Sequence, residues 1–183
     1  VLASRDDAKC DEVAATCAQR PGQTLVVKTD VTDTGSVADL VARIDEVFGD
    51  IHVLVNNAGG VAYPRNWEEK PPDEMQWEVD LNIWGVVHCT NAVGAQMLAR
   101  GSGAIVNITS IAGHRGFTEH LCYAASKAGL EGATRVMAKE LGPHNIRVNA
   151  VAPTITLTEL AVEAWSDPAK SEPMMVRHPI GRF

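Results

Sequence analysis

Short apolar segments alternate with helix-like segments along the 183 residues, and this alternation limits the folds that the chain can adopt. The apolar segments are expected to be strands, and they cover residues 1–3, 24–28, 51–55, 104–109 and 146–151. Between them the sequence predicts helices over residues 6–20, 37–48 with Ser36 as the cap, 73–100 and 121–141. Apolar strands separated by helices are typical of a parallel sheet covered on both faces. We therefore expect one α/β domain over residues 1–183, with a doubly wound parallel sheet.

Charge and hydropathy argue against two classes of partner. The chain has 16 Lys and Arg against 23 Asp and Glu, a formal net charge of −7, and no basic stretch, so nucleic acid is not an expected partner. No apolar run approaches the roughly 18 residues of a membrane span, and no charged-then-apolar leader is present. These features predict a cytoplasmic protein that binds no membrane.

Cysteine and histidine spacing gives no sign of a disulfide framework or a metal centre. The four cysteines form no C-x-x-C pair and are predicted to be buried, reduced thiols: Cys10, Cys17, Cys89 and Cys122. The six histidines show no H-E-x-x-H motif and no clustered ligand spacing, so no metal site is expected.

The residues that follow each predicted strand are the candidates for a ligand site, because doubly wound sheets bind ligands beyond the carboxyl ends of their strands. They are Ser4-Arg5, Asp30-Val31, Asn56-Asn57-Ala58-Gly59, Thr109-Ser110 and Pro153 to Thr158. The helix predicted at residues 121–141 adds Tyr123 and Lys127 to this set.

Tyr123 and Lys127 lie four residues apart, so both side chains are expected on one helix face, one turn apart. A phenol ordinarily ionises near pH ~10, so a tyrosine acting as acid or base near neutrality needs a pKa lower by about three. A nearby ammonium in a partly dry site can supply the roughly 4 kcal/mol that this takes. Ser110 ends a strand thirteen residues before Tyr123, where its hydroxyl can polarise a substrate oxygen. Such a Tyr–Lys pair alone is common on solvated helices; its combination with the strand-end residues favours catalysis.

Motifs of one known family occur in order along the chain. They are D-V-T-D (30–33), N-N-A-G (56–59), D-L-N (80–82), I-T-S (108–110), Y-A-A-S-K (123–127) and R-V-N-A-V-A-P (147–153). In these motifs the sequence resembles the short-chain dehydrogenase/reductase family. The resemblance implies a Rossmann-like fold and an oxidoreductase that transfers a hydride between nicotinamide C4 and a carbinol or carbonyl carbon.

The same resemblance implies roles for individual residues. Tyr123 would be the catalytic acid/base, and Lys127 would lower its pKa and hold the nicotinamide ribose. Ser110 would bind the substrate oxygen, and Asn82 would hold a water in the proton relay. The implied cofactor contacts are Asp30 and Val31 at the adenine, Asn57, Ala58 and Gly59 on the adenosine-ribose side, and Pro153 with Thr156 to Thr158 at the nicotinamide.

Cofactor choice depends on the end of the strand at residues 1–3. An acidic side chain there would accept hydrogen bonds from the ribose hydroxyls of NAD(H) and repel a 2′-phosphate. This sequence instead has Ser4 and Arg5, a hydroxyl and a guanidinium that together can bind a phosphate. NADP(H) is therefore favoured over NAD(H), although Asp6-Asp7 nearby weakens the case, and a solvated Arg5 at the start of a helix is the alternative.

The segment between Ser110 and Tyr123 is the main source of information on the substrate. It carries His114, Arg115, Glu119 and His120, which suit either a hydroxylated substrate or an ordinary exposed loop. Thr154 after Pro153, with W-S-D-P (165–168) and P-I-G-R-F (179–183), resembles the family branch of L-xylulose reductase and related polyol or dicarbonyl reductases. A small polyol, sugar or dicarbonyl is the expected substrate, and the 3-oxoacyl-thioester reductases, which share the catalytic set, are the enzymatic alternative.

One element of a dinucleotide site is missing from the 183 residues. They contain no T-G-x-x-x-G-x-G or G-x-G-x-x-G loop, so we expect the central first strand with its phosphate loop, and also the last strand, to be lacking. Such a chain is expected to bind NADP(H) poorly by itself, and a catalytically silent fragment that acts as an assembly partner is the non-enzymatic alternative.

A strip of small residues on the helix at 121–141 favours a homo-oligomer, a dimer or tetramer, over simple packing on the sheet: Ala125, Ala128, Gly129 and Gly132.

Overall fold

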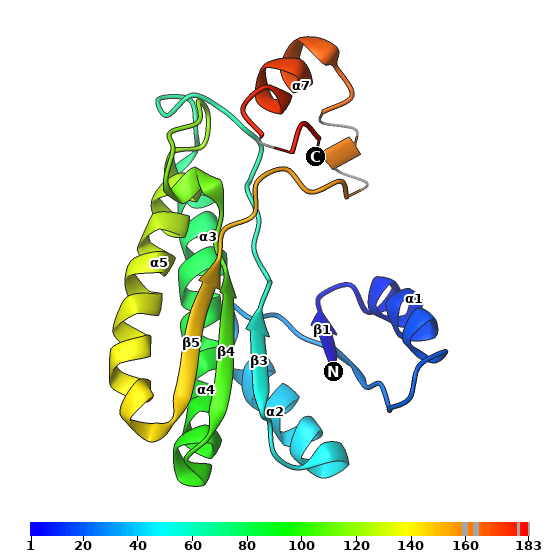
Figure 1. Ribbon diagram of the computed structural model, residues 1–183. Helices are drawn as coiled ribbons and strands as arrows, with labels where there is room; N and C mark the ends of the chain where they lie inside the picture. Colours follow the sequence, from blue (N-terminus) through cyan, green and yellow to red (C-terminus); the bar gives the residue numbers. More distant parts are fainter. Residues whose placement is uncertain (159–160, 163–164, 179, 183) are drawn as a thin grey trace. The chain divides into compact units, whose positions relative to one another are not determined.

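The computed structural model describes residues 1–158, 161–162, 165–178 and 180–182 and divides into two compact units, Val1–Val151 and Ala152–Phe183 (Figure 1). In the second unit, helix α7 spans Pro168–Met175 and is capped by Asp167. The sequence reading did not predict this helix.

Every strand in the first unit lies parallel to its neighbours. Strand β1 (Leu2–Ser4) pairs with β2 (Val26–Lys28). A second sheet has the order β3-β4-β5, with β3 at Val53–Asn56, β4 at Gly103–Ile108 and β5 at Ile146–Val151. These parallel strands, connected through helices, confirm the predicted α/β class.

The helices of the first unit follow the predicted order, and all except α5 have shifted ends. They are α1 (Asp7–Cys17), α2 (Thr34–Phe48), α3 (Pro72–Val79), α4 (Gly85–Arg100) and α5 (Leu121–Leu141). The predicted helix at 73–100 is interrupted by a π-helical turn at Asp80–Trp84, which separates α3 from α4. Short 3₁₀ turns occupy Ile111–Gly113 and Gly142–His144.

The expected cap of α2 was wrong by one turn. Asp33 precedes the helix with extended backbone, and its side chain accepts a hydrogen bond from Gly35 N. Ser36 lies inside the helix, and its hydroxyl accepts from Asp30 N at 2.9 Å. Ser36 therefore ties the loop after β2 to the start of α2.

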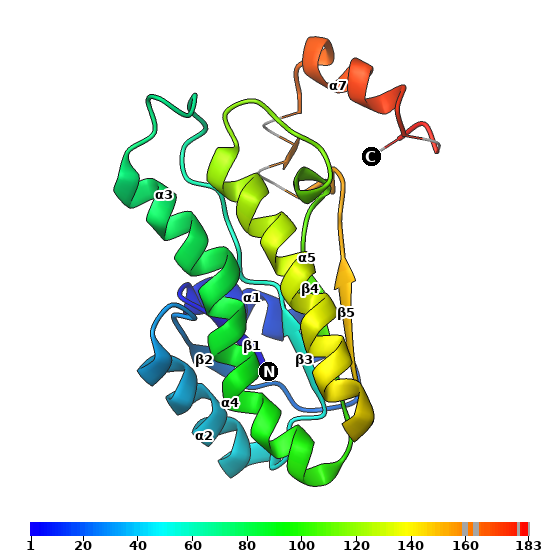
Figure 2. The ribbon, with the colours of Figure 1, turned by 90° about the vertical axis from the view of Figure 1, so that its left-hand side faces the viewer.

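Helices α4 and α5 lie side by side over one face of the β3-β4-β5 sheet (Figures 1 and 2). The core beneath them includes Met97 from α4, Ile105 from β4 and Ile146 from β5, all almost fully buried. On the opposite face Val53 and Val55 are 59% and 54% exposed. Helices were expected on both faces of the sheet. Helices α4 and α5 cover one face of β3-β4-β5, and these two valines are exposed on the other.

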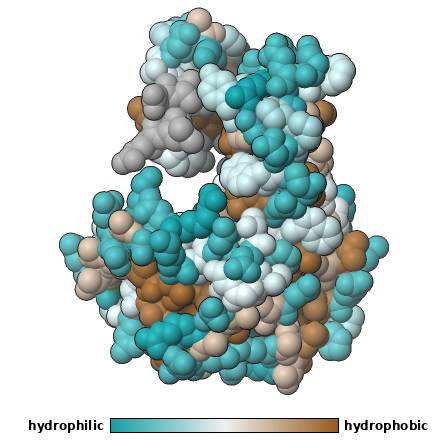
Figure 3. Space-filling view, turned by 180° about the vertical axis from the view of Figure 1, so that it is seen from behind, coloured by the Kyte–Doolittle hydropathy of each residue, from teal (hydrophilic) through white to brown (hydrophobic). Residues whose placement is uncertain are grey.

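A groove of about 350 Å³ lies between β1 and β3, which do not pair with each other. Its walls are mainly apolar, and they include Val1, Ala3, Val37, Leu40, Ile44, Val55 and Val93. Hydrophobic residues are visible among hydrophilic ones when the molecule is viewed from behind (Figure 3). A sheet of order 3-2-1-4-5-6 places its first strand at this position.

Two further expectations concern the cysteines and the membrane. All four cysteines are free, but only Cys89 is buried, so the prediction of four buried thiols was wrong for Cys10, Cys17 and Cys122. Within the described residues no helix has the length and apolar character needed to cross a membrane.

Candidate active site

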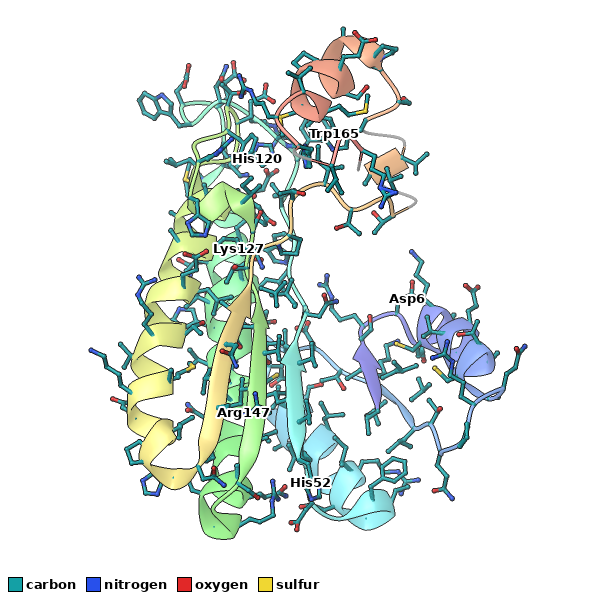
Figure 4. All side chains as sticks on the ribbon, in the orientation of Figure 1. Asp6, His52, His120, Lys127, Arg147 and Trp165 are labelled. Atoms are coloured by element: carbon teal, nitrogen blue, oxygen red, sulfur yellow. The ribbon has the colours of Figure 1, made fainter. Side chains whose placement is uncertain are left out.

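Helix α5 places Tyr123 and Lys127 one turn apart, as their spacing predicted. Lys127 Nζ lies 5.7 Å from the centre of the Tyr123 ring and donates a hydrogen bond to Ile108 O at 2.9 Å. Figure 4 labels Lys127 on α5. The lysine is 3% exposed, and this burial lowers its pKa from 10.5 to about 8. A lysine with that pKa is mostly protonated at pH 7, so a positive charge lies next to the phenol ring.

Two more predicted residues lie near the same ammonium group, Gly59 in the loop after β3 and Asn82 in the π-helical turn. A Cβ added at Gly59 would lie 2.9 Å from Lys127 Nζ and 2.8 Å from Asn82 Oδ1. Asn82 is fully buried in the π-helical turn, a feature common at functional sites. Its amide nitrogen donates to Gly60 O at 2.8 Å, and its Oδ1 accepts from Gly60 N at 3.1 Å. Gly59 is therefore in close contact with Lys127 and Asn82, and a larger residue does not fit there.

Ser110 lies two residues beyond Ile108, the last residue of β4, whose carbonyl Lys127 binds. Its hydroxyl oxygen accepts from Ala112 N at 3.1 Å and so caps the 3₁₀ turn at Ile111–Gly113. This bond fixes the oxygen while leaving the hydroxyl proton available to a substrate oxygen. The turn itself packs against α5, because a Cβ at Gly113 would lie 3.0 Å from Ala128 N.

A buried chain of amides and hydroxyls, missed by the sequence reading, joins the strands that carry these residues. Asn56 donates to Asn107 Oδ1 at 2.9 Å, and Asn107 donates to Thr134 Oγ1 at 2.9 Å. Thr134 in turn donates to Leu130 O, and Asn56 also reaches Thr90 Oγ1 at 3.3 Å. The available signal was an asparagine within each of two apolar strands, since a buried amide requires partners. The network links β3, β4, α4 and α5 directly beneath the site.

The adjacent ends of β1 and β2 hold the predicted adenosine contacts. Thr29 N donates to Ser4 O at 2.9 Å, which places Ser4 next to the loop that contains Asp30. Asp30 Oδ1 accepts from the hydroxyl and the amide of Thr32, and these bonds lower the pKa of the Asp30 carboxyl. Ser4 Oγ accepts from Asp6 N, and Arg5 is exposed.

Val31 is held against α4 by two contacts. Its carbonyl accepts from His88 Nδ1 at 3.0 Å, and its side chain lies 2.7 Å from the position of a Cβ at Gly85. The three residues predicted on the adenosine-ribose side, Asn57, Ala58 and Gly59, follow β3 and are exposed. The cofactor roles of all these residues stay predictions.

The remaining cofactor candidates lie in the second unit. Pro153 is half-buried, and Thr156 and Thr158 are exposed. Thr154 donates to His178 Nε2 at 3.0 Å, because the other ring nitrogen of His178 donates to Met174 O. Pro179 and Phe183, which belong to the motif read at 179–183, lie outside the described residues. A role of this unit in cofactor binding stays a prediction.

The polar loop before α5 contains a histidine in contact with Tyr123. The His120 ring lies edge-on to the Tyr123 ring with centres 6.1 Å apart. His120 Nδ1 lies 2.7 Å from Thr118 O, so Nδ1 carries the proton and Nε2 is an acceptor in the neutral ring. Glu119, just before it, has φ 67°, a backbone conformation that few non-glycine residues adopt.

The other two polar residues of this loop are not in contact with Tyr123 in any ring pair. His114 Nε2 lies 2.7 Å from Glu131 Oε1 on α5, and Arg115 is exposed. On α5, the small residues Ala125, Ala128 and Gly129 are also exposed, so the homo-oligomer interface suggested by them stays a prediction.

The lysine also provides a test of whether a nicotinamide ribose fits this site. Lys127 has three N–H donors, and among the described residues only Ile108 O accepts one of them. A buried ammonium group with donors to spare, beside a residue that has no side chain, suits a group with two adjacent hydroxyls.

Comparisons with known proteins agree with this geometry. The family model described as short chain dehydrogenase matches residues 1–169. The chain belongs to the short-chain dehydrogenase family. Bovine L-xylulose reductase is 38% identical over 184 residues, an alignment that covers 100% of this chain and 72% of that protein.

Solved structures of dehydrogenases have the same fold. The structure of an NAD⁺-bound xylitol dehydrogenase matches with a TM-score of 0.93 and 26% identity, over 100% of this chain and 75% of that one. A gluconate 5-dehydrogenase from Burkholderia cenocepacia in complex with NADP and tartrate matches with a TM-score of 0.90 and 27% identity. This match covers 100% of this chain and 71% of that one. As a short-chain dehydrogenase, the chain is an oxidoreductase of CH–OH groups with a nicotinamide cofactor. Because one of these structures contains NAD⁺ and the other NADP, family membership leaves the preferred cofactor open.

Proposed function

We propose that this short-chain dehydrogenase interconverts a secondary alcohol and a ketone on a small polyol, sugar or dicarbonyl compound, with NADP(H) as cofactor. The observation that carries the proposal is the buried Lys127 ammonium, which lies beside the Tyr123 ring and in contact with Gly59. L-xylulose reductase and xylitol dehydrogenase, two of the similar proteins, are named for small polyhydroxylated compounds.

The chemistry assigns one task to each side chain. The nicotinamide, when bound, supplies or accepts the hydride. In the reducing direction Tyr123 gives its phenolic proton to the carbonyl oxygen, and in the oxidising direction it takes that proton back. Lys127 stabilises the phenolate through its positive charge, and its unpaired N–H groups hold the ribose hydroxyls. Ser110 donates its hydroxyl proton to the substrate oxygen, because its oxygen is already committed to Ala112 N.

His120 supports the hydroxylated members of this substrate class, the polyols and sugars. Its Nε2 is an acceptor without a hydrogen-bond partner among the described residues, and its ring touches that of Tyr123. A neutral acceptor next to the catalytic phenol suits a hydroxyl on the carbon beside the carbonyl. An acyl thioester has a methylene group at that position and provides no such donor.

Arg5 supports NADP(H). Its side chain is exposed at the end of β1 and makes no hydrogen bond or ion pair with the residues that the structure describes. A guanidinium there can pair with a 2′-phosphate, and a charge-assisted bond of this kind contributes about 1.5–3 kcal/mol.

The test measures kcat/KM of the natural protein with NADPH and NADH, using L-xylulose, a vicinal diketone and an acetoacetyl thioester as substrates. We expect the first two to be reduced, with NADPH favoured by at least about tenfold. Arg5→Gln should raise the KM for NADPH about tenfold and leave that for NADH unchanged. Arg20→Gln, an exposed arginine just beyond α1, is the matched control. Preferred reduction of the thioester would contradict the substrate class, and equal use of both cofactors would contradict the cofactor choice.

A further inference from the structure

The loop at residues 60–70 is held along one face of helix α3 and the π-helical turn that follows it. Glu74, Glu78 and Asn82 recur every four residues, so they lie on the same side of this helical segment. Each of the three side chains binds the loop at a different point. Glu74 accepts from Arg65 with both carboxylate oxygens at 2.6 Å, and Asn82 exchanges two hydrogen bonds with Gly60.

The middle contact is a fully buried ion pair. Lys70 Nζ and Glu78 Oε1 are 2.5 Å apart, and both side chains are 0% exposed. The same Oε1 accepts from Ala62 N at 2.8 Å. Glu78 Oε2 has no hydrogen-bond partner among the described residues.

A buried ion pair of this kind is weak evidence for a role in stability. Taking two charges out of water is costly, and well-packed apolar residues often replace such pairs without loss of stability. What an apolar pair does not supply is an acceptor for Ala62 N. The carboxylate therefore has a specific effect on the backbone, which is to hold residue 62 against α3.

That position matters because of its neighbours in the chain. Ala62 is two residues beyond Gly60, whose amide and carbonyl both bind the Asn82 side chain. Gly59, one residue earlier, contacts Lys127 and Asn82. A shift of Ala62 away from Glu78 would pull on the Gly60–Asn82 pair and so on the site where Lys127 acts.

We propose that Lys70 and Glu78 form a positioning pair for the active site: a Glu78 side-chain oxygen fixes Ala62 and thereby keeps Gly60 bound to Asn82, while Lys70 balances the charge of the buried carboxylate. This proposal rests on the function proposed above. Neither residue is assigned a contact with substrate or cofactor, so both act through Asn82 and the loop.

Two double variants separate the hydrogen bond from the charges. The Met/Gln protein (Lys70→Met with Glu78→Gln) lacks both charges but keeps an oxygen that can accept from Ala62 N. The Met/Leu protein (Lys70→Met with Glu78→Leu) lacks the charges and the acceptor, and its side chains are of similar size. We expect kcat of the Met/Gln protein to remain within about threefold of wild type and kcat of the Met/Leu protein to fall at least about tenfold. Arg65→Met with Glu74→Gln is the matched control, because that pair is about one-third exposed and binds the loop through side chains alone; its kcat should change less than twofold.

Amide hydrogen exchange of Gly60 and Ala62 gives a readout independent of turnover. Both amides should exchange faster in the Met/Leu protein than in the Met/Gln protein, at a temperature where circular dichroism shows both to be folded. Equal kcat and equal exchange in the two double variants would overturn the proposal. If the Met/Leu protein does not fold, the Met/Gln protein decides alone: fast exchange of Ala62 in the folded protein would overturn it. A wild-type protein without reductase activity would refute the proposed function, while the exchange comparison would still test the positioning pair.

Discussion

Replacing Lys127 with methionine should separate the cost of a buried charge from its use in catalysis. Lys127 is 3% exposed, and burial lowers its pKa from 10.5 to about 8. The charged form is therefore disfavoured in the folded protein relative to the unfolded chain. Methionine has a similar length and carries no charge, so Lys127→Met removes this penalty and leaves the shape of the site nearly unchanged.

The size of the penalty follows from the two pKa values. Their difference is 2.5 pH units, and each unit corresponds to about 1.4 kcal/mol. Below pH 8 the buried charge therefore lowers the unfolding free energy of wild type by about 3 kcal/mol. Between pH 8 and 10.5 the unfolded chain holds a proton that the folded lysine has released, so wild-type stability rises with pH across this window. The penalty is thus fully present below pH 8 and lost as the pH approaches 10.5. Loss of the hydrogen bond to Ile108 O opposes the gain from methionine by about 1 kcal/mol at every pH.

The assay is urea unfolding of wild type and Lys127→Met at pH 7 and at pH 9. We expect the variant to be the more stable at pH 7 by about 2 kcal/mol, and its advantage to shrink by about 1.3 kcal/mol at pH 9. Comparing the two proteins cancels the other groups that titrate in this range. Lys139→Met, which alters an exposed lysine of the same helix, should leave the pH dependence of stability as it is in wild type.

If the difference in unfolding free energy between wild type and Lys127→Met stays constant from pH 7 to pH 9, the reasoning is refuted, because Lys127 is then not desolvated. Reductase activity gives the second half of the result. The more stable variant should lose at least about a hundredfold in kcat, since no ammonium remains to stabilise the phenolate.

Three further substitutions or treatments test other parts of the structure. Tyr123→Phe should lower kcat by about 10²–10⁴ while circular dichroism and the unfolding midpoint stay at wild-type values, and retained turnover would reject the acid/base assignment. Gly59→Ala should reduce both cofactor affinity, measured by fluorescence titration, and kcat, because its Cβ would lie 2.8 Å from Asn82 Oδ1 and 2.9 Å from Lys127 Nζ. Unchanged affinity and kcat would contradict that close contact. Cys89 should resist iodoacetamide at pH 8, because burial raises the pKa of its thiol to about 11, whereas the partly exposed thiols should be labelled. Peptide mass spectrometry measures the labelling, and rapid modification of Cys89 in the folded protein would count against its burial.

Periodicity and strand-end position were enough to predict the catalytic helix and its contents. The range 121–141 coincides with α5, and 146–151 coincides with β5, because Gly142-Pro143 interrupts the chain between two segments of clear period. Four-residue spacing placed Tyr123 and Lys127 on one turn of helix, and it required no knowledge of the rest of the fold.

Contacts between distant segments were not accessible in this way. The Asn56–Asn107 bond joins residues on two strands, and only the parallel register of β3 and β4 makes them neighbours. Lys70 and Glu78 look like solvated charges, since a sequence gives no sign that both are buried. The interruption of the helix at Asp80–Trp84 contains no glycine or proline of its own.

The polar groups of the site are each held by a different part of the fold. Lys127 on α5 binds a carbonyl of β4, Asn82 in the π-helical turn binds the loop after β3, and Asn107 in β4 binds both β3 and α5. A buried polar group is stable only while its partner stays in place. Separation of α5 from β4 would therefore leave a charged amine, an amide and several carbonyls without partners at the same time. Such an arrangement makes partial opening of the site costly, and it follows that the catalytic geometry and the packing of α5 on the sheet should be lost together, in one transition, as the protein unfolds.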